Sequence, residues 1–212
     1  MHDRIRPCLA VAAVAAAYVA GAGIPVAQDP ADAMADAQAM VQAMEAAHAA
    51  PTAPGPFHEK LNRFIGDWDV TIRVWPMGPD APPMESTGSS SIEWAYGDRF
   101  AIEKLDADLR MGEMVMPLDS MTITGYDNYR NQYVGTMISG MSTEMINFQG
   151  GVSPDGTTFD YYGTMHEPML KVTGRLVRFN TVTDSNDHFV TSVYDLHAGS
   201  DYKVLEFEYV RK

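Results

Sequence analysis

The chain has 212 residues, of which 28 are acidic and 15 basic, and its formal net charge is −13. This length suits one domain with some additional sequence, and a hydrophobic content of 46% is ordinary for a globular core. A field of this sign repels phosphate backbones and anionic membrane surfaces, so we expect neither nucleic acid nor a membrane as a partner.

Residues 1–22 are typical of a secretory signal peptide. Arg4 and Arg6 precede LAVAAVAAAYVAGA, an unbroken run of apolar and small residues that is short for a membrane span. We expect cleavage after Ala22 or as late as Ala27, with an uncleaved anchor as the alternative. Removal of one acidic and two basic residues leaves 27 against 13, a charge of −14. The predicted location is periplasmic or secreted.

The cysteine content excludes several kinds of chemistry. Cys8 is the only cysteine, and it lies within the predicted signal peptide. The preceding Ile-Arg-Pro lacks the small apolar residues expected before a lipid-modified cysteine. The mature chain would contain no cysteine, which excludes thiol catalysis, disulfides and cysteine-ligated metals.

Residues 28–56 predict a helix followed by a stiff linker. Segment 31–50 is rich in Ala, Gln, Met and Glu, which favour helices, and Asp29-Pro30 is a plausible start. The prolines from Pro51 onward cannot continue the helix. We expect a solvated helix, with a partner-binding or self-pairing helix as the alternative. Its narrow apolar stripe, at a/d-like spacing, consists of Met34, Ala37, Val41 and Met44.

The segment 57–212 changes period and predicts an all-β domain. FHEKLNRFIG places Phe57, Leu61 and Phe64 on one helical face, and Gly66 ends this short helix. Alternation of apolar and polar residues then recurs in about ten short runs separated by polar turns. The runs lie near 68–74, 87–94, 99–105, 121–126, 132–138, 143–148, 158–164, 172–180, 188–196 and 202–210.

Strands without intervening helices predict an antiparallel meander. Closing the meander into a barrel removes its two exposed edges, and a barrel of about 8–10 strands can enclose one small ligand. The single short helix favours the barrel because it can cover one end. A two-sheet sandwich is the alternative, and it would leave no cavity.

The segment GYDNYRNQYVGTMISGMST, 125–143, predicts a tight turn and the strand that follows it. Gly125, Asp127 and Asn128 are typical turn residues, and Tyr133 begins an alternating face. No lysine follows the glycines and no helix can begin there, so the segment is not a phosphate-binding loop.

This segment resembles the signature of the bacterial family catalogued as domain of unknown function 1579. HEKLNRFIGDWDV, from His58, resembles the family's opening element, and Gly97-Asp98-Arg99-Phe100 resembles its Gly-Gly-Arg-Phe. DYYGTMHEPM and the ending EFEYVRK also fit, so the resemblance covers about 57–212. It implies a lipocalin- or calycin-like barrel without implying an activity or ligand. Where the family usually has Trp-x-Asp-Ser, this chain has Met-Ile-Ser-Gly at 137–140.

The six histidines have no spacing typical of a local zinc site. His58 and His166 are the most interesting candidates for a metal or haem ligand. Met111, Met114 and Met116 carry thioethers that can bind copper(I) in an oxidising compartment, although a methionine-bearing hairpin packing into a gap is the alternative. We expect no cofactor, with haem and copper as the alternatives.

A carboxylate pair for acid–base chemistry could come from several acidic residues near strand ends and turns. The chain has no Gly-x-Ser-x-Gly elbow, and DSNDH lacks the glycine and glutamate of a calcium loop, so it predicts a hairpin turn. We therefore lean against enzyme activity and assign no catalytic residue. The charged residues considered are Asp98, Arg99, Glu103, Asp127 and Glu144.

Aromatic and methionine side chains at alternating positions would either fill the barrel or line a cavity for an apolar molecule. In a hollow barrel, Arg99 and Arg211 would meet an acidic head group at the mouth, or each could be part of a buried structural pair. The candidate cavity or mouth residues are Trp68, Trp94, Arg99, Tyr126, Tyr133, Met137, Tyr161, His166 and Arg211.

Three functions follow from these expectations. The leading one is an exported barrel that binds a small hydrophobic ligand. The alternatives are a small envelope enzyme with carboxylate and histidine chemistry at the barrel mouth, and an interaction scaffold that uses the N-terminal helix. A large apolar cavity favours the first, a histidine–carboxylate cluster in a pocket the second, and a filled barrel with an exposed methionine stripe the third.

Overall fold

The computed structural model describes residues 30–167 and 171–212. The predicted signal peptide and its cleavage positions lie outside the described residues. The chain divides into two compact units, Met1–Ala53 and Pro54–Lys212. Within the part of the chain that is described, no helix combines the length and apolar character needed to cross a membrane.

Helix α2 (Pro30–Thr52) lies in the first unit. It begins one residue before and ends two residues after the predicted range 31–50, within the ordinary uncertainty of helix termini. Pro51 lies in its final turn. The side chains of Met34 and Met44 are exposed, as the prediction of a solvated helix requires.

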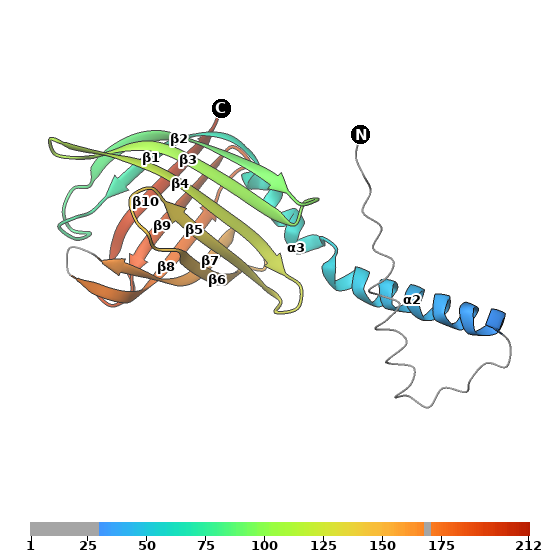
Figure 1. Ribbon diagram of the computed structural model, residues 1–212. Helices are drawn as coiled ribbons and strands as arrows, with labels where there is room; N and C mark the ends of the chain where they lie inside the picture. The colour runs from blue at the N-terminus through green and yellow to red at the C-terminus, as the bar shows by residue number, and fades with distance from the viewer. Residues whose placement is uncertain (1–29, 168–170) are drawn as a thin grey trace. The chain divides into compact units, whose positions relative to one another are not determined.

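The second unit is a closed antiparallel barrel (Figure 1). Each strand pairs with the next one along the chain, and β1 pairs with β10 to close the ring. The predicted all-β meander and its closure are therefore confirmed, and the two-sheet sandwich is excluded. The strands are β1 (Gly66–Val74), β2 (Met84–Ala95), β3 (Phe100–Met111), β4 (Met114–Asp127), β5 (Gln132–Ser139), β6 (Ile146–Val152), β7 (Thr158–Glu167), β8 (Val172–Thr183), β9 (His188–Asp195) and β10 (Lys203–Arg211).

Three strands differ most from their predicted ranges. β3 and β4 extend beyond 99–105 and 121–126 to form one long hairpin that turns at Gly112, where φ is +66°. Backbone pairing extends it, since the ladder runs without interruption to the turn although the added residues do not alternate clearly. β6 starts three residues later than predicted and includes two adjacent glycines. At the first of them, Gly150, the backbone of β7 lies too close for any side chain.

A short helical segment covers one end of the barrel, as predicted (Figure 1). It consists of α3 (Pro56–Glu59) and the 3₁₀ helix η1 (Lys60–Phe64); we call the two together the plug. Leu61 and Phe64 are buried, and each points into the barrel as the helical spacing requires. Gly66 follows with a φ of +138°, a conformation that favours glycine at the start of β1.

The outer face of β1, β2, β9 and β10 carries a charged network. Arg73 bonds to Glu85, Glu206 and Glu208, with nitrogen–oxygen distances of 2.8, 3.0 and 2.7 Å. His188 contacts Glu208 at 3.2 Å, and its other ring nitrogen lies 2.9 Å from the carboxylate of an aspartate in the β8–β9 turn. The hydrogen bond that His188 donates to that aspartate, followed by the one that it donates to Glu208, raises the pKa of His188 despite partial burial.

Candidate functional site

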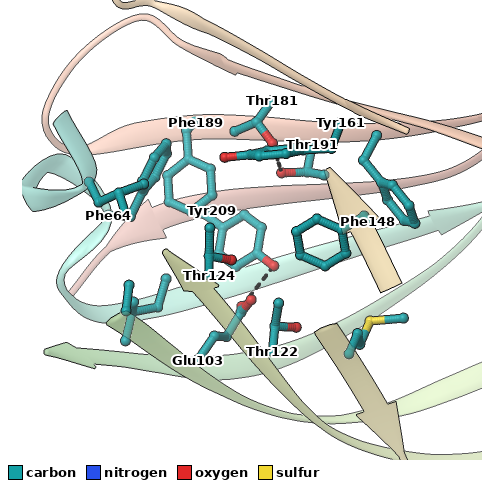
Figure 2. Close-up of a pocket in the computed structure, with 15 residues that line it drawn as sticks. Phe64, Glu103, Thr122, Thr124, Phe148, Tyr161, Thr181, Phe189, Thr191 and Tyr209 are labelled. Carbon is teal, nitrogen blue, oxygen red and sulfur yellow. Dashed lines mark hydrogen bonds between the residues drawn. The ribbon is translucent and has the colours of Figure 1, made fainter. Parts of the chain in front are cut away.

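The barrel encloses a cavity of about 140 Å³ next to the plug (Figure 2). Six of the fifteen lining residues carry aromatic rings, and the polar groups include one carboxyl group, four threonine hydroxyls and the Tyr209 hydroxyl. Leu61 and Phe64 of the plug form part of the wall, so the helix closes the cavity from one end. The lining residues are Leu61, Phe64, Ile92, Ala101, Glu103, Thr122, Thr124, Met137, Phe148, Tyr161, Phe179, Thr181, Phe189, Thr191 and Tyr209.

Strand alternation explains how residues from nine strands and the plug reach one cavity. Successive side chains of a strand point to opposite faces, so Ala101 and Glu103 of β3 face inward while the residue between them faces outward. The register places Thr122 of β4 directly opposite Glu103, and Thr124 opposite Ala101. Antiparallel pairing thus sets a carboxyl group and two hydroxyl groups on neighbouring inner positions.

Glu103 is the central polar residue of the cavity. Ser90 and Tyr209 both donate hydrogen bonds to its Oε1, with oxygen–oxygen distances of 2.8 and 2.9 Å. Among the described residues, its second oxygen Oε2 has no hydrogen-bond partner. The side chain is enclosed by protein, and the surface that it retains faces the cavity (Figure 2). Burial raises the pKa of Glu103, and the hydrogen bonds from Ser90 and Tyr209 oppose this shift.

The other polar groups of the cavity are hydroxyls. Burial, and then the adjacent carboxyl of Glu103, raises the pKa of Tyr209 well above its usual value, so it remains a neutral donor. Thr181 and Thr191 bond to each other at 2.8 Å across β8 and β9, on the opposite side of the cavity from Glu103 (Figure 2). No lysine, arginine or histidine belongs to the lining described above.

The aromatic rings form two groups around the cavity. Phe189 stacks on Tyr209 with ring centroids 4.1 Å apart, and Phe64 packs against Phe189 edge to face at 4.9 Å. On the other side, Phe148 packs against Tyr161 with ring centroids 5.3 Å apart, and it also packs against the one phenylalanine of β8. In the view of Figure 2 the Tyr209 ring lies between the rings of Phe189 and Phe148. Such contacts hold the rings in fixed positions, which favours a preformed cavity.

Of the nine residues predicted for the cavity or its mouth, Met137 and Tyr161 line it. Four others bind the plug to the barrel. The Trp68 indole donates to the Phe64 carbonyl at 2.8 Å, and the Trp94 indole donates to a plug asparagine at 2.9 Å. The Tyr133 hydroxyl donates to a plug carbonyl at 2.7 Å, and the fourth residue is Arg211.

Arg211 holds the plug through its guanidinium group. It donates to the carbonyls of Arg63 and Ile65 at 2.9 and 2.8 Å, and it lies 4.1 Å from the centre of the Trp68 ring. It also bonds to the β8–β9 turn through Asn186. The guanidinium group that was predicted to meet an acidic head group is therefore bonded to the plug and to a turn.

The three remaining predicted residues also lie outside the lining. Tyr126 stacks on the plug residue Phe57 with centroids 4.4 Å apart. Arg99 donates to two carbonyls of the β2–β3 turn. His166 is exposed and lies near Glu144, whose carboxylate accepts a hydrogen bond from the His166 backbone N–H at 3.1 Å. This histidine and carboxylate meet, but not in the cavity.

The two histidines singled out as candidate ligands, His58 and His166, lie in different surroundings. Across the described residues, no group of three or more His, Cys, Asp or Glu side chains could hold a metal ion. His58 is buried in the plug, where it accepts a hydrogen bond from the Gly55 N–H at 3.1 Å. Burial, and then the charge of Arg99, lowers the pKa of His58. Met114, at the tip of the long hairpin, is exposed.

The sequence interpretation named Glu103 as one of several acidic candidates and did not place it in the cavity. A signal was present, since Glu103 occupies the same alternating positions as Ala101 and Leu105. The signal was weak because Ile102, on the opposite face, is also apolar. The four threonines carried no signal, because threonine is common on both faces of strands.

The fold and site together define a closed, ten-stranded antiparallel β-barrel with a small aromatic cavity and one carboxyl group in its lining. A family model described as a protein of unknown function (DUF1579) matches residues 53–211, and the chain belongs to this family. The resemblance seen in the sequence is therefore confirmed.

The solved structures to which this chain is similar are distant in sequence. Rv2717c from M. tuberculosis is 13% identical with a TM-score of 0.53, over 76% of this chain and 99% of that one. The S-type phycobiliprotein lyase CPES from Guillardia theta is 10% identical with a TM-score of 0.48, over 74% of this chain and 92% of that one. Comparison with curated proteins gives no match. At such identities the likeness to Rv2717c shows a shared fold alone.

Proposed function

We propose that this protein binds a small, mostly apolar molecule inside its barrel. The observation that carries this proposal is the cavity of about 140 Å³, which rings and aliphatic side chains enclose around a few polar groups. Small-molecule sites have this composition, in which apolar walls supply affinity and a few polar groups fix orientation. An engineered apolar cavity of roughly 150 Å³ in another protein binds benzene, so the size suits a ligand with one ring.

The cavity also bears on the two alternative functions. Enzyme chemistry with a histidine and a carboxylate requires both in one pocket, and His166 and Glu144 meet outside the described lining. A filled barrel would have favoured a scaffold role, whereas this barrel has a cavity next to its plug. Ligand binding therefore remains the leading function, and we propose export on the strength of the N-terminal sequence alone.

The test compares toluene binding to the wild type and to two methionine variants of β4. Thr124→Met places a longer side chain in the cavity, and Ile123→Met introduces the same residue on the opposite face of the same strand. A ligand that binds only the folded state raises the unfolding temperature. We expect toluene to raise it for the wild type and Ile123→Met, and to have little effect on Thr124→Met. Equal responses of the two variants, or none in the wild type, would overturn the proposal.

A further inference from the structure

We propose that the cavity selects small molecules that join an apolar group to a cationic amine, with the ammonium group bound to Glu103 and the apolar group packed among the aromatic rings. This inference rests on the ligand binding proposed above and names the chemical class of the ligand.

The first argument is the charge of the cavity. Its described lining contains one carboxyl group and no basic side chain that could neutralise it. A buried carboxylate without a counter-ion is unfavourable, and burial accordingly raises the pKa of Glu103. A cationic ligand supplies the missing charge, whereas an anionic ligand, such as a small carboxylic acid, would place like charges together.

The second argument is the geometry of the hydrogen bonds. Oε1 of Glu103 already accepts from Ser90 and Tyr209, and two donors on one oxygen stabilise the ionised form. Oε2 remains open to the cavity, and Thr122 lies opposite in the β3–β4 register with Thr124 two residues further along. An ammonium group has three donors, and these three side chains offer acceptors on adjacent inner positions.

The third argument is the arrangement of the rings. Tyr209 reaches Glu103 through its hydroxyl, so its ring lies next to the proposed ammonium position. Phe189 stacks on that ring at 4.1 Å, and Phe148 and Tyr161 complete the wall. The faces of aromatic rings attract cations within about 6 Å, and aromatic cages recognise substituted ammonium groups in this way.

In the proposed binding step Glu103 loses one proton as the cationic ligand enters. Burial favours the neutral form of Glu103 in the empty cavity, and its proton would sit on Oε2 because Oε1 already accepts two hydrogen bonds. The ammonium ligand enters with its charge, Glu103 becomes a carboxylate, and one proton leaves to solvent. Amine affinity should therefore rise with pH until the amine itself loses its proton.

The experiment measures calorimetric binding of benzylamine, benzyl alcohol and toluene, which share one ring and differ in the polar group. We expect benzylamine to bind the wild type at least about tenfold more tightly than the other two, because one charge-assisted hydrogen bond is worth about a decade of affinity or more. Glu103→Gln keeps an acceptor for Ser90 and Tyr209 and should abolish the preference. The matched control, Glu93→Gln, removes the same charge from an exposed position on β2 and should retain it.

The outcomes separate this inference from the proposed function. If toluene or benzyl alcohol binds the wild type as tightly as benzylamine, the amine preference is wrong and ligand binding stands. If Glu93→Gln loses the preference as fully as Glu103→Gln, general attraction to an acidic protein explains it and the site assignment is wrong. If none of the three binds, ligand binding itself fails. Should Glu103→Gln not fold, wild-type titrations in two buffers of different ionisation enthalpy report the released proton, and its absence would contradict the proposal.

Discussion

Two adjacent glycines on β6 provide a matched test of how closely the strands around the cavity pack. A Cβ atom at Gly150 would overlap the carbonyl oxygen of Asp160 and lie 2.7 Å from the Cα of Tyr161, whose ring lines the cavity. Both contacts are with the β7 backbone, so the strands must separate. A Cβ atom at Gly151 would meet no other atom within 4 Å.

The expected effects have opposite signs. Overpacking costs about 1–3 kcal/mol, so Gly150→Ala should lower the free energy of unfolding by at least that amount. Gly151→Ala should raise it by about 0.4–1 kcal/mol, because alanine restricts the unfolded chain more than glycine does. At about 2–4 °C per kcal/mol for a domain of this size, the two midpoints should differ by about 3–16 °C. Scanning calorimetry measures the difference, and midpoints within about one degree would refute the packing argument.

Three further predictions concern charge and processing. Because the pKa of Glu103 is raised in the folded state, the free energy of unfolding of the wild type should fall as pH rises above about 4.5. Glu103→Gln should remove this part of the pH dependence. Urea unfolding at several pH values measures it, and the same pH dependence in both proteins would contradict the prediction. The pKa of His188 is also raised, so its contribution to the free energy of unfolding is fully present below about pH 6.5 and is lost as pH rises through the folded pKa. His188→Gln should therefore be less stable than the wild type at acidic pH only. An equal loss of stability at alkaline pH would count against the ion pairs of His188. Expression in an exporting host should yield a mature chain cleaved after Ala22 or Ala27, and an intact N-terminus by mass spectrometry would show that the signal prediction is wrong.

The number and order of the strands could be predicted from the sequence, because alternation with a period of two and turn residues such as Asp127 are local signals. In the structure the Asp127 carboxylate accepts hydrogen bonds from two backbone N–H groups of the predicted turn, at 2.9 and 3.1 Å. The plug was also predictable, since Leu61 and Phe64 fall on one helical face. Closure followed from a general argument about strand edges.

The roles of individual aromatic residues could not be predicted in the same way. Trp68 and Tyr161 both occupy inward positions, and alternation assigns a face without assigning a height along the barrel. Height depends on the registers of all ten strands and on the depth that the plug reaches. That is why Trp68 holds the plug while Tyr161 lines the cavity.

The sequence by itself determined an all-β barrel with a helical cover, its family, its acidic charge and its lack of cysteine after residue 8. Only the tertiary structure decided that the barrel is hollow beside the plug and that Glu103 is the carboxyl group inside it. A cavity is the volume left unfilled by side chains from distant strands, so no local pattern encodes it. The same holds for the environment of Glu103, because Tyr209, 106 residues away in the chain, supplies one of its two hydrogen bonds.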